Sequence, residues 1–177
     1  SLDLAHLREQ INNQTKLVAV CAASNFSGSV TPVKEIGRLA HEAGALVFID
    51  AVHYAPHRLI DVTDWDCDFL VCSAYKFFGP HVGILYGKRP LLENSTPYKL
   101  RPAPDELPGR WMTGTQNHEC IMGTKAAVDY LISLSPKADH RREALRQTMA
   151  AIDVYESKLM AHLLVSLQKI QSYTLYG

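Results

Sequence analysis

The chain has 177 residues, of which 47% are hydrophobic and 20% are charged, and these values are typical of one globular domain with a sizeable core. Its 18 basic residues balance its 18 acidic ones, so no net charge attracts nucleic acid or an anionic membrane, and we expect a small neutral or zwitterionic ligand. No apolar run reaches the roughly 18 residues needed to cross a bilayer, and no signal peptide opens the chain, so we expect a cytoplasmic protein.

The first 50 residues follow a β-α-β pattern. Apolar residues at helical spacing predict a helix from Leu4 to Ile11, and the run 17–22 predicts a buried strand. A helix is expected over 32–43, followed after a very short loop by a strand over 45–49. A β-α-β crossover makes its two strands parallel.

The helix over 32–43 has start and stop signals at both ends. Thr31 offers a hydroxyl for the N-cap, Pro32 suits the first turn, and Gly44 suits the stop.

The second half contains two more strands and two helices. A strand is predicted over 68–72, and another over 82–86 follows after so short a link that it is expected to run antiparallel. Four prolines make 94–110 a long surface loop. A helix over 117–133 has Thr115 or Asn117 as its cap, and the periodic apolar residues of 139–170 predict a long packing helix rather than a coiled coil.

Two polar residues mark a candidate ligand site, because each follows a predicted strand. Asp50 ends the strand 45–49, and Lys76 lies just beyond the strand 68–72 in Ser73-Ala74-Tyr75-Lys76. In open α/β sheets, ligands bind at the carboxyl ends of strands. A partly buried Lys76 beside two phenylalanines could form a Schiff base, Asp50 could hold a pyridinium nitrogen protonated, and the hydroxyls of Ser73 and Tyr75 could bind a phosphate.

Other chemistries are less well supported. Ser73-x-x-Lys76 matches the signature of penicillin-recognising acyl enzymes, but their Ser-Asp-Asn and Lys-Thr-Gly elements are absent. His53 and His57 have the spacing of metal ligands on a helix, but Pro56 lies between them, so no metal site is predicted. The four cysteines form no Cys-x-x-Cys pair and are expected to be reduced core thiols.

The segment from Ile49 to Tyr86, IDAVHYAPHRLIDVTDWDCDFLVCSAYKFFGPHVGILY, resembles the cofactor core of class V aminotransferases, especially their cysteine desulfurase and selenocysteine lyase group. The similarity extends to Ser24–Gly28 upstream and to Gly114–Asn117 downstream. It implies an α/β fold that forms part of the large domain of a fold type I enzyme dependent on pyridoxal 5'-phosphate (PLP). That fold has a mostly parallel sheet with flanking helices and ends in a long linker helix.

The resemblance also implies roles for individual residues. Lys76 matches the lysine that forms the Schiff base with the cofactor, Asp50 the partner of the pyridine nitrogen, and Ser73 a phosphate ligand. Tyr75 stands where the desulfurases usually have histidine, and its hydroxyl is expected to contact the phosphate.

Three further residues are implied around the cofactor. His53 replaces the usual glutamine that faces the phenolic oxygen, and Asn25 matches an asparagine near that oxygen. Thr115 matches a threonine that reaches the cofactor phosphate of the neighbouring subunit, so a homodimer is implied.

Family members are considerably longer, so the chain resembles an internal fragment. Residues 1–135 are expected to be the C-terminal part of the large PLP-binding domain, 136–171 a linker helix, and 172–177 the start of a truncated small domain.

The function implied is that of a PLP-dependent enzyme acting on an amino acid, with a cysteine desulfurase-like carbon–sulfur lyase as the leading interpretation. Aminotransferase and epimerase chemistry stay open within this class. A non-catalytic fragment or degenerate relative with a structural or interaction role is the alternative.

Overall fold

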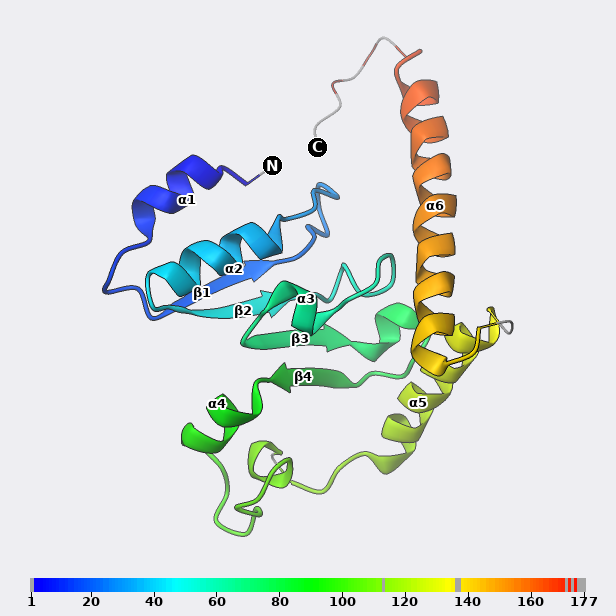
Figure 1. Cartoon of the computed structure of the whole chain (residues 1–177). Coiled ribbons are helices and arrows are strands. Elements are labelled where there is room, and N and C mark those ends of the chain that lie inside the picture. The colour runs from blue at the N-terminus through cyan, green and yellow to red at the C-terminus, as the bar shows by residue number, and fades with distance from the viewer. Residues whose placement is uncertain (1, 113, 136–137, 171, 173, 175–177) are drawn as a thin grey trace.

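The computed structural model describes residues 2–112, 114–135, 138–170, 172 and 174, and its four strands form one sheet in the order β1-β2-β3-β4 (Figure 1). The strands are β1 (Leu17–Cys21), β2 (Leu46–Asp50), β3 (Phe69–Ser73) and β4 (Gly83–Gly87). The helices are α1 (Leu4–Gln10), α2 (Val33–Glu42), α3 (Val62–Trp65), α4 (Arg89–Asn94), α5 (His118–Ser133) and α6 (Arg141–Leu167), with short 3-10 turns η1 (Ala74–Phe77) and η2 (Gly109–Trp111). The predicted strands and long helices are therefore present, close to their expected bounds.

The sheet is mixed, with three parallel strands and one antiparallel strand. β1 pairs with β2, and β2 with β3, in parallel, whereas β4 runs antiparallel to β3. The parallel connections pass through α2 and the α3 segment, whereas β3 and β4 are joined by η1 and a few further residues. A link of this length is too short for a parallel crossover, which confirms the expected reversal of β4.

The core lies between the sheet and α2. Val47 and Ile49 alternate along β2 as its fully buried residues and face Ile36 of α2 in one apolar cluster. Leu4, Leu7 and Ile11 pack against this cluster from the α1 segment, so the predicted apolar stripe is confirmed. Because alternate residues of a strand point to opposite faces, Phe48 and Asp50 lie on the face of β2 away from α2.

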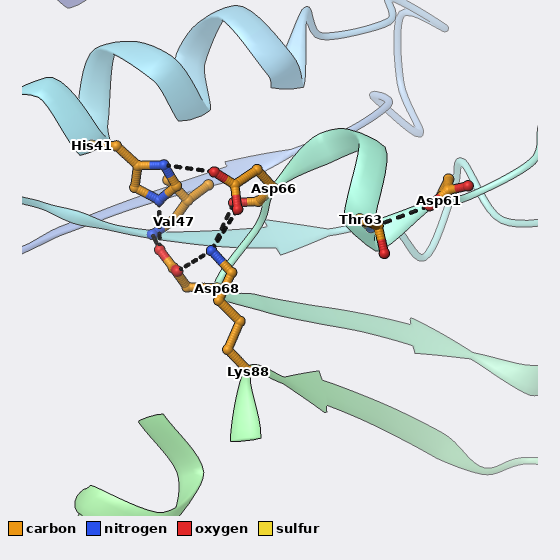
Figure 2. Close-up of polar contacts among 7 residues, drawn as sticks. All are labelled: His41, Val47, Asp61, Thr63, Asp66, Asp68 and Lys88. Atoms are coloured by element: carbon orange, nitrogen blue, oxygen red, sulfur yellow. Dashed lines mark hydrogen bonds and ion pairs between the residues drawn. The ribbon is translucent and has the colours of Figure 1, made fainter. Parts of the chain in front are cut away.

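A buried carboxylate joins four elements at the end of the sheet opposite the carboxyl ends of the parallel strands (Figure 2). Asp68 is only 4% exposed, and its Oδ2 accepts hydrogen bonds from the Val47 amide at 2.8 Å and from His41 Nε2 at 2.9 Å. Its Oδ1 lies 2.9 Å from Lys88 Nζ, which also pairs with Asp66 at 2.7 Å. The buried charge is thus fully partnered, as burial in a low dielectric requires.

Two local predictions are wrong. Thr31 is not the N-cap of α2, because the helix begins one residue later, after Pro32, and no side chain caps it. The backbone amide of Thr31 instead donates to the carbonyl of Ala22 at 2.9 Å, so Thr31 belongs to the connection from β1. Among the four free cysteines, Cys21 is exposed on an edge strand and is not a core thiol, whereas Cys67 is buried.

α6 packs on α5 only over its first half. The buried residues of α6 are Ala144, Thr148 and Met149, and Thr148 Oγ1 donates to the carbonyl of Leu131 in α5 at 2.8 Å. Beyond this contact the helix extends past the sheet (Figure 1). Within the described parts of the chain, no helix has both the length and the apolar character needed to cross a membrane.

Candidate functional site

The candidate site begins at the carboxyl ends of the three parallel strands. Asp50, the last residue of β2, lies in register between Cys21 of β1 and Val71 of β3. The ladder continues beyond it, because the Ala22 amide donates to the Asp50 carbonyl at 2.7 Å and the Ala51 amide to the Val71 carbonyl at 2.8 Å. Asp50 is therefore held by backbone pairing on both sides.

Asp50 and Ser73 project to the same face of the sheet. Asp50 is in register with Val71, and Ser73 is two residues further along β3, so the alternation of side chains places all three on one face. This face is the one away from α2. Asp50 Oδ1 accepts a hydrogen bond from the Val52 amide at 2.9 Å, and within the described residues neither Asp50 Oδ2 nor the Ser73 hydroxyl has a hydrogen-bond partner.

Lys76 lies in η1, immediately after β3, in a turn with little freedom. Ala74 is fully buried, its amide donates to the Val82 carbonyl at 2.9 Å, and its carbonyl accepts from the Gly79 amide at 2.9 Å. A Cβ on Gly79 would lie 2.9 Å from both the Cβ and the carbonyl oxygen of Ala74, so only glycine fits without a shift. Gly79 thus permits a tight turn, and this turn places the half-buried Lys76 just after the end of β3.

The amine of Lys76 lies over an aromatic ring. Its Nζ is 5.1 Å from the centroid of the Tyr75 ring, and Tyr75 in turn stacks on His81 with a centroid distance of 4.9 Å. Tyr75 is 44% exposed. Among the described residues, Lys76 has no hydrogen bond or ion pair, so its amine is not committed to a carboxylate.

Asn25 and His53 line a cavity of about 780 Å³ between the loop after β1, the segment after β2 and α6. Two contacts bridge its wall: a hydrogen bond between His57 Nδ1 and Glu156 at 2.8 Å and an ion pair between Arg58 Nε and Asp153 at 3.0 Å. Asp50, Ser73 and Lys76 do not line this cavity. Asn25 and His53 therefore share this cavity, whereas Asp50 and Ser73 share one face of the sheet and Lys76 lies in the turn after β3.

Thr115 lies neither in this cavity nor at the strand ends. It is exposed in the loop before α5, where Asn117 is the N-cap and its Oδ1 accepts from the Cys120 amide at 3.0 Å. Of the two predicted caps for this helix, Asn117 is confirmed, and Thr115 is left accessible at the surface.

His53 and His57 do not lie on one face of a helix, which is the arrangement that their spacing would need for metal ligation. The segment that carries them forms turns rather than a helix, and His57 is paired with Glu156. No group of three or more His, Cys, Asp or Glu residues able to hold a metal ion occurs among the residues described.

Sequence reasoning missed the contribution of α6 to the cavity. Asp153 and Glu156 lie three residues apart on α6 and pair with the segment after β2. Their spacing marks one side of a helix, but only the tertiary structure shows which segment that side faces.

Comparison with known proteins identifies the family. The model of the aminotransferase class-V family matches residues 1–177. The chain belongs to this family. It is 37% identical to a cysteine desulfurase of Pectobacterium atrosepticum over 100% of the chain and 44% of the relative, and 35% identical to one of Serratia proteamaculans with the same coverage. The chain thus spans less than half the length of these curated relatives.

Solved structures show the same fold. A cysteine desulfurase from Thermococcus onnurineus, determined without ligand, matches with a TM-score of 0.79 at 27% identity, over 96% of the chain and 42% of that protein. One from Escherichia coli matches with a TM-score of 0.68 at 28% identity, over 81% of the chain and 37% of that protein. This chain therefore has the α/β fold of the fold type I PLP enzymes, with a mostly parallel sheet, flanking helices and a long final helix.

The residues at the strand ends fit the chemistry of pyridoxal phosphate. Its ring nitrogen is stabilised in the protonated form by a carboxylate, its aldehyde reacts with an amine, and its phosphate needs hydrogen-bond donors. Asp50 has a carboxylate, Lys76 an amine and Ser73 a hydroxyl, and each has an atom without a hydrogen-bond partner among the described residues.

Proposed function

We propose that the chain is the cofactor-binding part of a PLP-dependent enzyme that acts on an amino acid, with cysteine desulfurase-like cleavage of a carbon–sulfur bond as its reaction. The observation that carries this proposal is the placement of Asp50 and Ser73 on one face of the sheet, with Lys76 in the rigid turn that follows. Family membership supports the cofactor class, and the names of the relatives support cysteine as the substrate.

Each residue has a proposed role toward the cofactor. Lys76 would hold the aldehyde carbon through its ε-amine, Asp50 would face the ring nitrogen, and Ser73 with Tyr75 would donate to the phosphate. The cofactor, when bound, supplies an electron sink for the substrate's α-carbon. Lys76, once its amine is free, takes and returns the proton at that carbon.

The two residues in the cavity would lie beside the phenolic oxygen of the cofactor ring. His53 and Asn25 both line the cavity beside the strand ends, and we propose that they orient the phenolic oxygen of the ring. Aminotransferase or epimerase chemistry would use the same Lys76 and Asp50, so the substrate assignment rests on the relatives alone.

We propose a homodimer in which Thr115 reaches the phosphate bound by the other subunit. The exposure of Thr115, which lies neither in the cavity nor at the strand ends of its own chain, supports this proposal.

We also propose the domain division 1–135, 136–171 and 172–177, with α6 as the linker to a small domain. The second half of α6 supports it, because its exposed apolar residues point in several directions around the axis: Val154, Tyr155, Leu159, Met160, Leu163 and Val165. Apolar side chains on several sides of a helix are usually covered on more than one side, which further protein achieves and a single partner helix does not.

Borohydride reduction in the presence of PLP tests the central assignment. Reduction makes the bond between the cofactor and its lysine permanent, and peptide mass spectrometry then locates the label. We expect the label on Lys76 and its loss in Lys76→Ala, whereas Lys158→Ala, at an exposed site on α6, keeps it. Undiminished labelling of Lys76→Ala would overturn the assignment.

A further inference from the structure

Lys76 contacts a stacked aromatic pair whose second member has no role in the proposed chemistry. The Lys76 ammonium lies over the Tyr75 ring, 5.1 Å from its centroid. The ring planes of Tyr75 and His81 are only 17° apart at a centroid distance of 4.9 Å, so the two rings are stacked. Within the described residues, the Lys76 amine contacts the Tyr75 ring and makes no hydrogen bond or ion pair.

The turn between β3 and β4 brings the two rings together. The Ala74 amide donates to the Val82 carbonyl at 2.9 Å, and the Val82 amide to the Pro80 carbonyl at 2.8 Å. These bonds close the loop that carries both Tyr75 and His81 and hold the backbones of the two residues close enough for their rings to stack. Stacking on His81 in turn restricts the orientation of the Tyr75 ring.

An aromatic face attracts a cation because of its quadrupole, and it attracts a neutral amine much less. The Tyr75 ring therefore attracts the Lys76 ammonium and holds the side chain in the turn that follows β3. The free amine is the form that attacks an aldehyde. The aromatic pair thus affects both the place and the reactivity of the amine.

We propose that Tyr75 and His81 are positioning residues for Lys76: Tyr75 holds its ammonium group through a cation–π contact, and His81 fixes the Tyr75 ring by stacking. The contact itself needs no cofactor. A failure of this inference is therefore distinct from a failure of the PLP assignment, which the borohydride experiment tests separately.

Amine acetylation of the cofactor-free 177-residue chain tests the inference. The extent of acetylation at Lys76 is measured by peptide mass spectrometry, relative to Lys158 in the same sample, across a range of pH. The variants are Tyr75→Leu, which removes the ring, Tyr75→Phe, which keeps it, and His81→Leu, which removes the stacking partner. Tyr75 and His81 are both exposed, so these substitutions leave the core intact, and circular dichroism verifies the fold of each variant.

In Tyr75→Leu we expect relative acetylation of Lys76 at neutral pH to rise about two- to five-fold. This factor corresponds to the free energy of an exposed cation–π contact. The pH of half-maximal labelling should fall by about 0.3 to 0.7, a change that altered accessibility alone does not produce. Tyr75→Phe should behave like the parent chain, and His81→Leu should shift in the same direction as Tyr75→Leu by a smaller amount. An unchanged pH profile in Tyr75→Leu, or a shift in Tyr75→Phe equal to it, overturns the role of Tyr75, and a parent-like His81→Leu overturns that of His81.

Discussion

At the scale of single residues, the position of Lys76 depends on Gly79, which has no side chain. Gly79 lies against Ala74, the buried first residue of η1, and any Cβ there would meet backbone atoms that cannot rotate away. The preceding Phe78 adopts a left-handed conformation with φ of 69°, which turns the chain back toward β4. The lysine is thus presented by a turn whose geometry the glycine permits.

Gly79→Ala is expected to lower the free energy of unfolding by about 1–3 kcal/mol, because the added methyl overpacks a well-filled turn. Gly83→Ala is the matched control, since a Cβ there has no heavy atom within 4 Å. Urea unfolding followed by circular dichroism measures both. Equal stability of the two variants would mean that the turn adjusts freely and does not constrain Lys76.

At the scale of elements, one carboxylate joins a short helix to the longest one. Asp61 is the N-cap of α3, where its Oδ1 accepts from the amides of Thr63 and Asp64. Its Oδ2 accepts from Arg142 at 2.6 Å and Arg146 at 3.0 Å, both in α6. The amide of Asp64 and the guanidinium of Arg142 lower the pKa of Asp61 below its ordinary value, although desolvation opposes them.

Two substitutions of Asp61 distinguish its N-cap hydrogen bonds in α3 from its ion pairs with the arginines of α6. Asp61→Asn keeps an oxygen for the cap but loses the charge that pairs with the arginines, whereas Asp61→Ala loses both. We expect the melting temperature to fall in both variants, by on the order of 3–6 °C in Asp61→Ala and by less in Asp61→Asn. Identical melting temperatures for the two variants, measured by differential scanning calorimetry, would contradict a capping role.

Sequence periodicity predicted the long elements well, and the short ones were missed. The strands and α2, α5 and α6 have enough residues for an apolar pattern to appear, whereas α3 has 4 residues and α4 has 6. Asp61 before Val62 is a recognisable cap signal for α3, but a cap without a following periodic run is too common in loops to predict a helix.

At the scale of the whole molecule, the buried Asp68 couples stability to pH. Burial raises the pKa of Asp68, but hydrogen bonds from Lys88, His41 and the Val47 amide outweigh it and hold the pKa below its ordinary value. A carboxyl with a lower pKa in the folded state stabilises the fold above its unfolded pKa, near 4, and this stabilisation is lost as the pH falls through the folded pKa. Burial lowers the pKa of Lys88, but Asp66 and Asp68 raise it on balance, so its contribution is lost only above about pH 10.

Asp68→Asn is therefore expected to lower the free energy of unfolding at pH 7 by about 2–3 kcal/mol, because the Lys88 ammonium loses the buried carboxylate with which it pairs. Its stability should also fall less steeply than that of the parent chain between pH 5 and pH 2. Asp64→Asn, whose ion pair with Lys34 is exposed, should change stability at pH 7 by less than about 0.5 kcal/mol. Urea titrations at several pH values measure these differences, and parallel pH profiles for Asp68→Asn and the parent would refute the coupling.

The apolar surface of α6 and the open sheet edges lead us to expect self-association of the 177-residue chain. β1 and β4 are the outer strands of the sheet, and Leu163 on α6 is 49% exposed. Leu163→Glu should reduce light scattering at a given concentration. Leu100→Glu adds the same charge at a 66% exposed leucine in a loop away from α6, and it should have little effect. A monodisperse parent chain would contradict this expectation.

The sequence alone determined the order of the elements, the parallel pairing of the first two strands, the reversal of the fourth and the location of Asp50 and Ser73 at strand ends, because periodicity and link length are local properties. Only the tertiary structure decided what these residues contact. It placed Asp50 and Ser73 on the face away from α2, lined a cavity with Asn25 and His53, and set Lys76 over the Tyr75 ring, which stacks on His81. The sheet face and the cavity depend on segments far apart in the chain, and the stack of Tyr75 on His81 depends on the conformation of the turn between them, so no apolar pattern in the sequence encodes them.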